Sequence, residues 1–303
     1  MQMGKHAFLI MAYDDERFLN LLLKKLDDIR SDLYIHIDKK SKIDINKFKN
    51  ICKLSSVYFI DRIEVTWGSE KQIITEMKLL KESTSRQFYD YYHLISGHDF
   101  PLVNSEEFYK FFDERFGMEF IDCREENLEK IVLRIKYYYP FQTILSGKSL
   151  FNRGMNKMSQ VIQKIFKVDR LKNNKFKYGF GANWFSITDS FARYVVSQEK
   201  FIKKYFYKGI CADEMFLQSV WLNSPMYNKK QLFENFENNS ELEPKCRNAL
   251  RAVDFSKGDG RSPRIFNEND YKLLINSGCI FGRKFDSERS RKLVEMLSTK
   301  HNT

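Results

Sequence analysis

Two neighbouring acids, Asp213 and Glu214, are the residues best suited to proton transfer in this sequence. Apolar residues follow them at nearly helical spacing: Met215, Phe216, Val220 and Trp221. This spacing predicts a helix over residues 213–222 that begins with both carboxylates. A carboxylate in the first turn of a helix can be held in place while its oxygens face a pocket, as a general base for an alcohol requires. The alternative is that both acids only complement the helix dipole.

These acids need a scaffold, and the first part of the sequence predicts one. Apolar runs typical of buried strands alternate with segments of helical periodicity. The expected strands span 7–12, 33–37, 57–60 and 92–95, and the expected helices span 14–30, 70–82 and 105–115. Such alternation predicts an α/β fold with a doubly wound, mostly parallel sheet flanked by helices. Ligands of these sheets bind beyond the carboxyl ends of the strands.

The second half of the sequence is less regular. It predicts a strand over 184–187 and helices over 190–198 and 268–275. No internal repeat and no low-complexity linker divides the chain. We therefore expect one catalytic domain over residues 1–303, with a basic amphipathic segment inserted at about 145–178.

The chain carries a net charge of +11, which favours an anionic partner. Nucleic acid, an anionic membrane face and a phosphorylated substrate all fit this charge. The 40 acidic residues and the absence of a nucleic-acid-binding motif argue against nucleic acid, so no such partner is expected. A nucleic-acid-associated α/β protein remains the alternative in the binding class.

Much of the positive charge lies between Lys148 and Lys177, where nine basic residues accompany a single acid, Asp169. An apolar stripe runs through the same segment: Phe151, Met155, Met158, Ile162 and Ile165. A basic amphipathic helix of this kind can lie on an anionic bilayer. The alternative is an ordinary surface helix that packs its stripe on the core.

The sequence lacks the motifs of a dinucleotide site, a P-loop, a nucleophile elbow and a zinc protease. The sequence has no GxGxxG after its first strand, no GxxxxGK[ST], no GxSxG and no HExxH. Its five cysteines are scattered without a CxxC pair, which argues against a zinc site or a disulfide framework and favours a reducing compartment. No stretch reaches the roughly 18 apolar residues of a membrane-spanning helix. We expect a soluble protein, or one attached to a membrane only at its surface.

Five segments in order resemble one family. They are Ile35–Ser41 (IHIDKKS), His93–Leu102 (HLISGHDFPL), Gly181–Ile187 (GANWFSI), Ala212–Glu214 (ADE) and Phe281–Asp286 (FGRKFD). They resemble segments of the core-2/I-branching β-1,6-N-acetylglucosaminyltransferases, glycosyltransferase family 14, which includes peptide O-xylosyltransferases. The resemblance runs from about Ala7 to Asp286. It implies a GT-A fold with a Rossmann-like sheet, and an inverting transfer from a UDP-sugar to a hydroxyl.

The resemblance also implies roles for particular residues. Glu214 would be the general base, and Asp213 would cap its helix or orient the acceptor. No cofactor and no divalent metal would be needed, because Arg261 and Lys284 would carry the diphosphate charge; Arg264 is a rival for the arginine role. This agrees with Asp38, which lies in His-Ile-Asp rather than in a metal-chelating Asp-x-Asp. Judged without the resemblance, these cations are ordinary turn and surface residues.

The resemblance implies further residues for the donor site and the acceptor site. Asp38 would accept the uracil N3–H, Trp67 would stack on a ring and Asp99 would bond sugar hydroxyls. The alternatives are that Asp38 caps the end of a strand, that Trp67 belongs to the core and that Asp99 forms a turn. The remaining expected donor residues are Met11, Ala12, Tyr13, Val65, Thr66 and Gly97. The expected acceptor residues are Asp122, Arg134 and Asp213, with Arg124 and Lys130 as further candidates.

Members from animals carry a membrane anchor and a stem, and we expect neither in this protein. We therefore expect a bacterial-type, cytoplasmic enzyme that moves GlcNAc, xylose, galactose or glucose to a glycan or lipid-linked glycan acceptor in surface polysaccharide synthesis. Peripheral contact with the anionic inner face of the membrane would fit the basic segment. A non-catalytic sugar-nucleotide-binding relative is the alternative.

Overall fold

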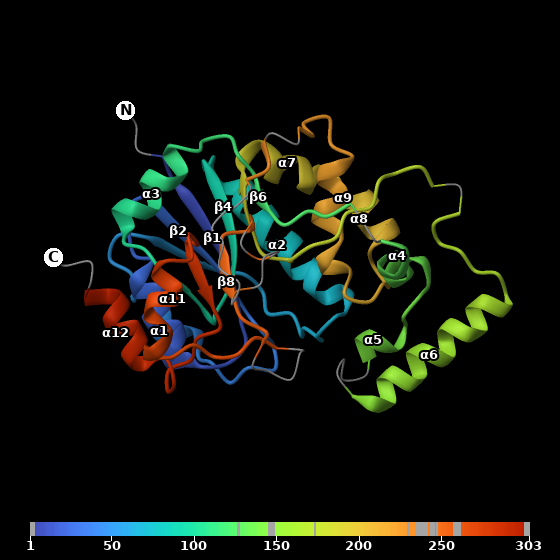
Figure 1. Ribbon diagram of the computed structural model, residues 1–303, viewed down its shortest axis with the longest axis horizontal. Coiled ribbons are helices and arrows are strands. Elements are labelled where there is room, and N and C mark those ends of the chain that lie inside the picture. Colours follow the sequence, from blue (N-terminus) through green and yellow to red (C-terminus); the bar gives the residue numbers. More distant parts are fainter. Residues whose placement is uncertain are drawn as a thin grey trace.

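The computed structural model describes residues 4–125, 128–144, 149–172, 174–228, 231–233, 242, 246, 248–256 and 262–299. Within these residues a central sheet lies between two layers of helices (Figure 1). Three further elements, α4 (Glu129–Lys136), α5 (Phe141–Ile144) and α6 (Leu150–Ile165), form an extension beside the α2 and α8 layer. None of the helices described is long and apolar enough to cross a bilayer.

The central sheet has the strand order β3-β2-β1-β4-β7-β6. Its parallel part consists of β3 (Ser56–Phe59), β2 (Ser31–Ile37), β1 (His6–Ala12) and β4 (Tyr91–Ser96). Strand β7 (Phe185–Thr188) runs antiparallel to both β4 and β6 (Phe120–Ile121). The predicted α/β fold with a mostly parallel sheet flanked by helices is therefore confirmed, with an antiparallel edge. β2 is buried along its whole length because helices cover both faces of the sheet.

Two apolar cores lie on opposite faces of this sheet. The first core is covered by α1 (Glu16–Lys25), α3 (Ser105–Asp113), α11 (Tyr271–Ile275) and α12 (Arg291–Thr299). The second is covered by α2 (Glu70–Arg86), α7 (Asp189–Ser197), α8 (Glu199–Tyr205) and α9 (Phe216–Leu222). The short 3-10 helices are η1 (Ile45–Phe48), η2 (Ala212–Glu214) and η4 (Glu268–Asp270).

A second, three-stranded sheet ties the tail of the chain to the end of β4. Its order is β5-β9-β8, with β5 at Asp99–Pro101, β9 at Phe281–Arg283 and β8 at Arg251–Val253. The antiparallel pairing of β5 with β9 sets Arg283 opposite Asp99. The residues that follow β9 are thereby brought to the carboxyl ends of the central strands.

The predicted helix over 213–222 is wrong in its first turn. Asp213 and Glu214 lie in the 3-10 helix η2, and α9 begins only at Phe216. The backbone turns sharply on both sides of the acids, with φ of 47° at Cys211 and −132° at Met215. This break lets the Asp213 side chain face inward, where Gln72 Nε2 donates to its Oδ2 at 3.0 Å. The two carboxylates therefore sit in a turn before the helix.

Helix α6 also differs from one expectation. If it were an ordinary surface helix, its apolar stripe would pack on the core, yet its buried residues are two asparagines, Asn152 and Asn156. Phe151 and Ile165 of the stripe are 67% and 71% exposed. The core-packing interpretation is therefore wrong for this segment.

Candidate active site

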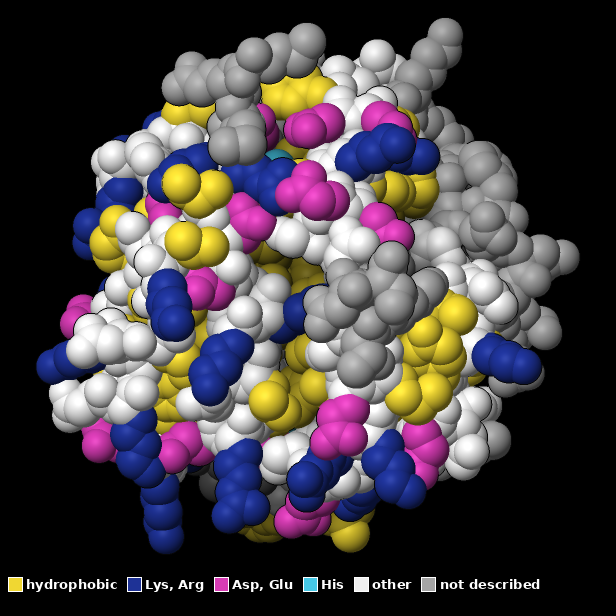
Figure 2. All heavy atoms as spheres, turned by 90° about the vertical axis from the view of Figure 1, so that its left-hand side faces the viewer, with side chains coloured by type: hydrophobic (Ala, Val, Ile, Leu, Met, Phe, Trp, Pro, Cys, Tyr) yellow, Lys and Arg dark blue, Asp and Glu magenta, His cyan; other side chains and the backbone are white. Residues whose placement is uncertain are grey.

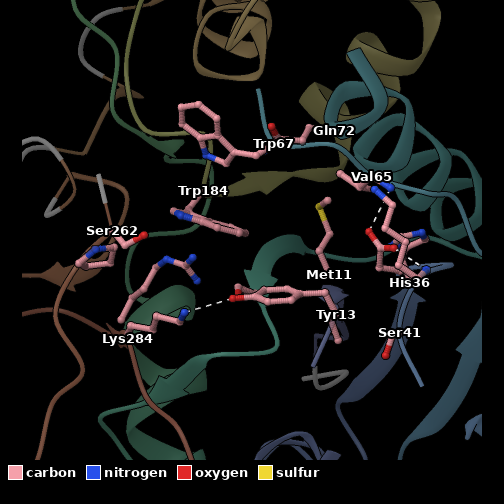
Figure 3. Close-up of a pocket in the computed structure, with 16 residues that line it drawn as sticks. Met11, Tyr13, His36, Ser41, Val65, Trp67, Gln72, Trp184, Ser262 and Lys284 are labelled. Atoms are coloured by element: carbon pink, nitrogen blue, oxygen red, sulfur yellow. Dashed lines mark hydrogen bonds between the residues drawn. The ribbon is translucent and has the colours of Figure 1, made fainter. Parts of the chain in front are cut away.

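A cavity of about 490 Å³ lies beyond the carboxyl ends of β1, β2 and β4 (Figure 3). The lining side chains come from strand ends, loops and the tail of the chain. They are Met11, Ala12, Tyr13, His36, Asp38, Lys40, Ser41, Val65, Trp67, Gln72, Ser96, Trp184, Ser262, Pro263, Arg283 and Lys284. In Figure 3, Tyr13 lies between an end formed by His36, Ser41 and Val65 and an end formed by Trp184, Ser262 and Lys284. The cavity is thus an elongated hollow with chemically different ends.

Asp38 is held rigidly at the first end. Its Oδ1 accepts the backbone N–H of Lys40 at 2.8 Å, and its Oδ2 accepts that of Val65 at 3.0 Å. An ionised carboxylate accepts about four hydrogen bonds, so Asp38 keeps capacity for a ligand donor. Next to it, His36 Nε2 accepts the N–H of Ile63 at 2.9 Å. Burial lowers the pKa of His36 to about 4, so this ring is neutral at pH 7.

The loop before α2 contributes alternate residues to the cavity wall. Val65 and Trp67 line the cavity, whereas Thr66 points behind it. Thr66 Oγ1 donates to the carbonyl of Thr143 at 3.5 Å, and its own carbonyl accepts from Ser69 Oγ at 2.7 Å. Thr66 therefore fixes the loop rather than facing a ligand. Trp67 is 47% exposed, so the alternative of a core tryptophan is wrong.

Two cations from the tail lie at the other end. Lys284 Nζ donates to the hydroxyl of Tyr13 at 3.1 Å, and no ion pair joins Lys284 to a carboxylate of the described residues. Arg283 donates to Asp99 Oδ1 at 2.8 Å and lies over the ring of Trp184, 4.6 Å from its centroid. Both cations line the cavity. An anionic group placed between them would meet the ammonium of Lys284 and the guanidinium of Arg283, which is already paired with Asp99.

Asp99 and Gly97 support this end from behind. Asp99 is fully buried, and besides Arg283 it accepts the N–H of Ser96 at 3.1 Å. It does not line the cavity and its partner is Arg283, so the expected hydrogen bond from Asp99 to sugar hydroxyls stays a prediction. Gly97 packs against β1, where a Cβ would lie 2.9 Å from Ala12 Cβ. Both residues shape the cavity without facing it.

The expected arginines of the C-terminal turn are placed differently. Arg261 lies outside the described residues, although its neighbours Ser262 and Pro263 line the cavity. Arg264 does not line it. Its guanidinium donates twice to Asp270 at 2.7 Å and also pairs with Asp254, and these bonds raise its pKa further. Arg264 is thus engaged in holding the turn between β8 and η4.

A second group of charged residues surrounds Phe180. Glu214 Oε2 accepts from Arg134 at 2.6 Å, and Arg134 lies 5.0 Å from the Phe180 ring centroid. Arg124 lies over the same ring at 4.6 Å, with its Nε 3.8 Å from Asp122 Oδ2. The structure therefore brings together Asp122, Arg134 and Glu214, which are distant in the sequence.

This group adjoins the cavity through one side chain. Glu214 does not line the cavity, but Gln72 does, and Gln72 donates to Asp213, the neighbour of Glu214. The Glu214 side chain is 39% exposed, so a substrate can reach it. The arrangement offers a reachable carboxylate close to, but outside, a hollow that has cations at one end. No three His, Cys, Asp or Glu side chains of the described residues are placed to hold a metal ion.

Asp213 is the inner member of the acidic pair. Burial raises its pKa to about 7, with the charge of Glu214 adding to the rise. Glu76 of α2 is also buried, and burial together with Asp213 raises its pKa well above the ordinary value. At neutral pH these inner acids hold protons more strongly than exposed carboxyls do.

This shift predicts how stability depends on pH. The pKa of Asp213 is about 7 in the folded protein against 3.8 ordinarily, so the folded state binds more protons between these values. The free energy of unfolding should therefore fall as pH rises through this window. We expect Asp213→Asn to flatten this fall and to be more stable than the wild type at about pH 8, by on the order of 1 kcal/mol.

Urea unfolding of both proteins at about pH 4.5, 6 and 8 measures this difference. Asp90→Asn is a less buried comparison, since the pKa of Asp90 is also raised by burial. Parallel stability profiles for Asp213→Asn and the wild type would show that Asp213 does not retain its proton on folding.

Sequence reasoning missed several residues of the cavity. Trp184 and Arg283 lie inside segments used for the family resemblance, so their position in those segments was an available signal. Ser41 also ends one of these segments, whereas Gln72 carries no comparable pattern. Their side chains reach the cavity only because α2 and the loop after β2 fold against it.

Comparisons with known proteins show the family of this chain. The family model described as "Branch: Core-2/I-Branching enzyme" matches residues 6–274. Xylosyltransferase sqv-6 of Caenorhabditis briggsae is 21% identical over 298 residues, covering 93% of this chain and 34% of that protein. Xylosyltransferase 2 of Rattus norvegicus is 22% identical over 304 residues, covering 93% and 32%. The chain thus spans about a third of the length of these curated relatives.

Among solved structures, Staphylococcus aureus TarS 1-349 shows a partial likeness. It is 14% identical, with a TM-score of 0.37, and the match covers 73% of this chain and 56% of that one. The family assignment rests instead on the match over residues 6–274, which is most of the chain. That match agrees with the α/β sheet described above and with a GT-A-like fold. The chain belongs to the Core-2/I-branching enzyme family, which is a family of glycosyltransferases.

Proposed function

We propose that this chain is an inverting glycosyltransferase that moves a sugar from a UDP-sugar to a hydroxyl of a glycan acceptor without a divalent metal. One observation carries the proposal. Asp38 and Lys284, which are far apart in the sequence, line one hollow at the carboxyl ends of the strands. A reachable carboxylate, Glu214, lies beside that hollow. Family membership supports the same reaction class.

The donor nucleotide would occupy the hollow along its length. Asp38, fixed by two backbone amides, is suited to accept the N3–H of uracil. Met11 and Val65 offer apolar contact to the base, and Tyr13 lies between this end and the cations (Figure 3). The diphosphate would then lie near Lys284 and Arg283. Arg binds phosphate oxygens with a bidentate fork, whereas Lys acts as a point charge.

The chemical step would use charges already in place. The acceptor oxygen attacks the anomeric carbon while the bond from that carbon to the β-phosphate oxygen breaks. The hydroxyl proton passes to Glu214, and UDP leaves with the bonding electron pair. Lys284 and Arg283 would stabilise the developing negative charge more in the transition state than in the ground state. Arg134 binds one oxygen of Glu214, and the other oxygen would accept the proton.

Ligand-induced stabilisation tests the donor site. A ligand that binds only the folded state raises the melting temperature. We expect UDP to raise it more than ADP does, because Asp38 can accept a hydrogen bond from uracil N3–H. A panel of UDP-GlcNAc, UDP-xylose, UDP-galactose and UDP-glucose then identifies the sugar. Equal shifts with UDP and ADP would contradict a uracil-reading site.

Metal removal gives a separate prediction. If cationic side chains supply the charge that a metal would otherwise supply, EDTA should leave the rate of sugar transfer unchanged. The measurement compares initial rates after EDTA treatment with rates after addition of Mn²⁺ or Mg²⁺. A strict requirement for either ion would refute the metal-independent part of the proposal.

The biological setting extends the proposal. We infer a bacterial-type enzyme of the cytoplasm that acts in surface polysaccharide or glycoconjugate synthesis, on a glycan carried by a lipid. The net charge of +11 supports contact with the anionic face of a membrane. The proposal holds for each of the four donor sugars named above until the panel separates them.

A further inference from the structure

We propose that α6 is a docking helix that lies on an anionic membrane surface and is joined to the wall of the cavity by hydrogen bonds. The inference adds to the proposed function by saying how a lipid-carried acceptor would reach the site. Lipid binding itself can be measured without sugar transfer, so the two proposals can fail separately.

In α6 the polar face points inward and the apolar face points outward, which is the reverse of a helix that packs on an apolar core. Its inward face is polar: Asn152 and Asn156 are buried, and both donate to Gln142 Oε1, at 3.0 and 2.9 Å. Its outward face is apolar, and its side chains are between 46% and 80% exposed. They are Leu150, Phe151, Met158, Val161 and Ile162, continued by Ile165 and Phe166. Within the described residues, nothing covers this face.

Positive charge borders the apolar face. With 3.6 residues per turn, Arg153, Lys157 and Lys164 share one edge of α6, directly beside the stripe. The segment that follows adds exposed lysines: Lys167, Lys172, Lys175 and Lys177. Its single acid, Asp169, pairs with Lys136 at 3.1 Å. On an anionic bilayer, the exposed apolar stripe would contact the acyl layer and the cationic border would contact the anionic headgroups.

The opposite side of the molecule has a different character. Figure 2 shows the side away from α6, where Lys and Arg side chains are interspersed with Asp and Glu. Figure 1 shows α6 projecting from the body of the protein, where it can approach a flat surface. The uniformly positive charge therefore lies beside the exposed apolar face of α6.

The same helix is linked to the donor cavity by hydrogen bonds. Gln142, which binds both asparagines of α6, donates through Nε2 to the carbonyl of Trp67 at 2.8 Å. Trp67 lines the cavity. Two hydrogen-bonded steps thus join the inward face of α6 to the cavity wall. The exposed apolar face of α6 is opposite the asparagines that bind Gln142, so α6 would rest on the membrane while its inward face stays joined to the cavity wall.

A second copy of the chain is a less suitable occupant of this face. In a symmetric dimer the same patch is used by both subunits. The cationic edges formed by Arg153, Lys157 and Lys164 would then lie close together without acids to offset them. A membrane with anionic lipids supplies the opposite charge.

Vesicle co-sedimentation of the full chain tests the proposal. The probes are phosphatidylcholine vesicles with and without about 30% phosphatidylglycerol, an anionic lipid. We expect binding to the anionic vesicles, reduced at least about tenfold by Ile165→Ser with Phe166→Ser and, separately, by Lys157→Glu with Lys164→Glu. Matched controls elsewhere on the surface are Ile29→Ser with Phe88→Ser and Lys53→Glu with Lys200→Glu, which should bind as the wild type does.

Each outcome decides the proposal. Equal binding of α6 variants and controls, or no binding by the wild type, would overturn it. So would sedimentation of the wild type as a dimer that the α6 variants abolish, because the face would then be covered by a second copy. A cooperative thermal unfolding transition, measured on every variant without ligand, shows that each remains folded. Retained UDP binding with no lipid binding would reject the docking helix alone, whereas lipid binding without UDP binding would reject the proposed function.

Discussion

Glu214→Gln should reduce the turnover number of sugar transfer by about 10²–10⁴-fold, the usual contribution of a general base. The amide cannot take up the proton of the acceptor hydroxyl, although it still fills the space of the carboxylate. Because Glu214 lies outside the lining of the cavity, the dissociation constant for UDP should change little. A loss of turnover with unchanged UDP affinity is the pattern expected for a residue that acts only on the acceptor.

The measurement pairs initial rates at saturating donor with UDP titration by calorimetry. Glu114→Gln serves as a control, since Glu114 is an exposed acid at the end of α3. Arg134→Lys is informative as well, because it keeps a positive charge near Glu214 but loses the planar fork. If Glu214→Gln transfers sugar at the wild-type rate, Glu214 is not the base.

Lys284→Ala should weaken the binding of UDP and slow transfer together, by about 10²–10³-fold in kcat/KM, the cost of removing one preorganised charge-stabilising group. Uridine, which has no phosphate, should bind the variant and the wild type with similar affinity. The ratio of UDP affinity to uridine affinity therefore isolates the contribution of the ammonium. Lys284→Arg should recover part of the ratio, since it restores the charge.

Lys272→Ala on α11 is the matched control, because it removes a lysine of the tail that does not line the cavity. An unchanged preference of Lys284→Ala for UDP over uridine would remove Lys284 from the diphosphate site. Arg283→Ala tests the second cation in the same assay, with the difference that it also releases Asp99 from its ion pair.

The sequence was sufficient for the regular part of the fold because local patterns determine it. The apolar run 7–12 and the periodic segment 70–82 correspond to β1 and α2. Helix α1 ends at Lys25, short of the predicted Arg30. The reason is tertiary: the Asp27 carboxylate accepts the backbone N–H groups of residues 53–55, and this contact between distant segments has no local signature.

The candidate site was predictable only where its residues follow strands or belong to the family resemblance. Asp38 and Tyr13 follow strand ends, and Lys284 lies in a recognisable tail segment; all three line the cavity. Side-chain direction was not predictable. Thr66 and Asp99 turn away because each has a backbone or ionic partner behind the wall. The apolar stripe of α6 was evident from spacing, but spacing does not tell which face a helix turns to water.

The small sheet formed by β5, β9 and β8 completes the cavity that we propose for the donor nucleotide, because it places Lys284 in the wall. Lys284 hydrogen-bonds Tyr13 across the hollow, so the pocket needs residues that are 271 positions apart in the sequence. A bound donor would bridge these two regions and hold the tail in place, because any ligand that requires both raises the cost of separating them. Donor binding and the docking of β9 would thereby be coupled: without β9 the central strands would still form one end of the cavity, but Lys284 would be missing from the other.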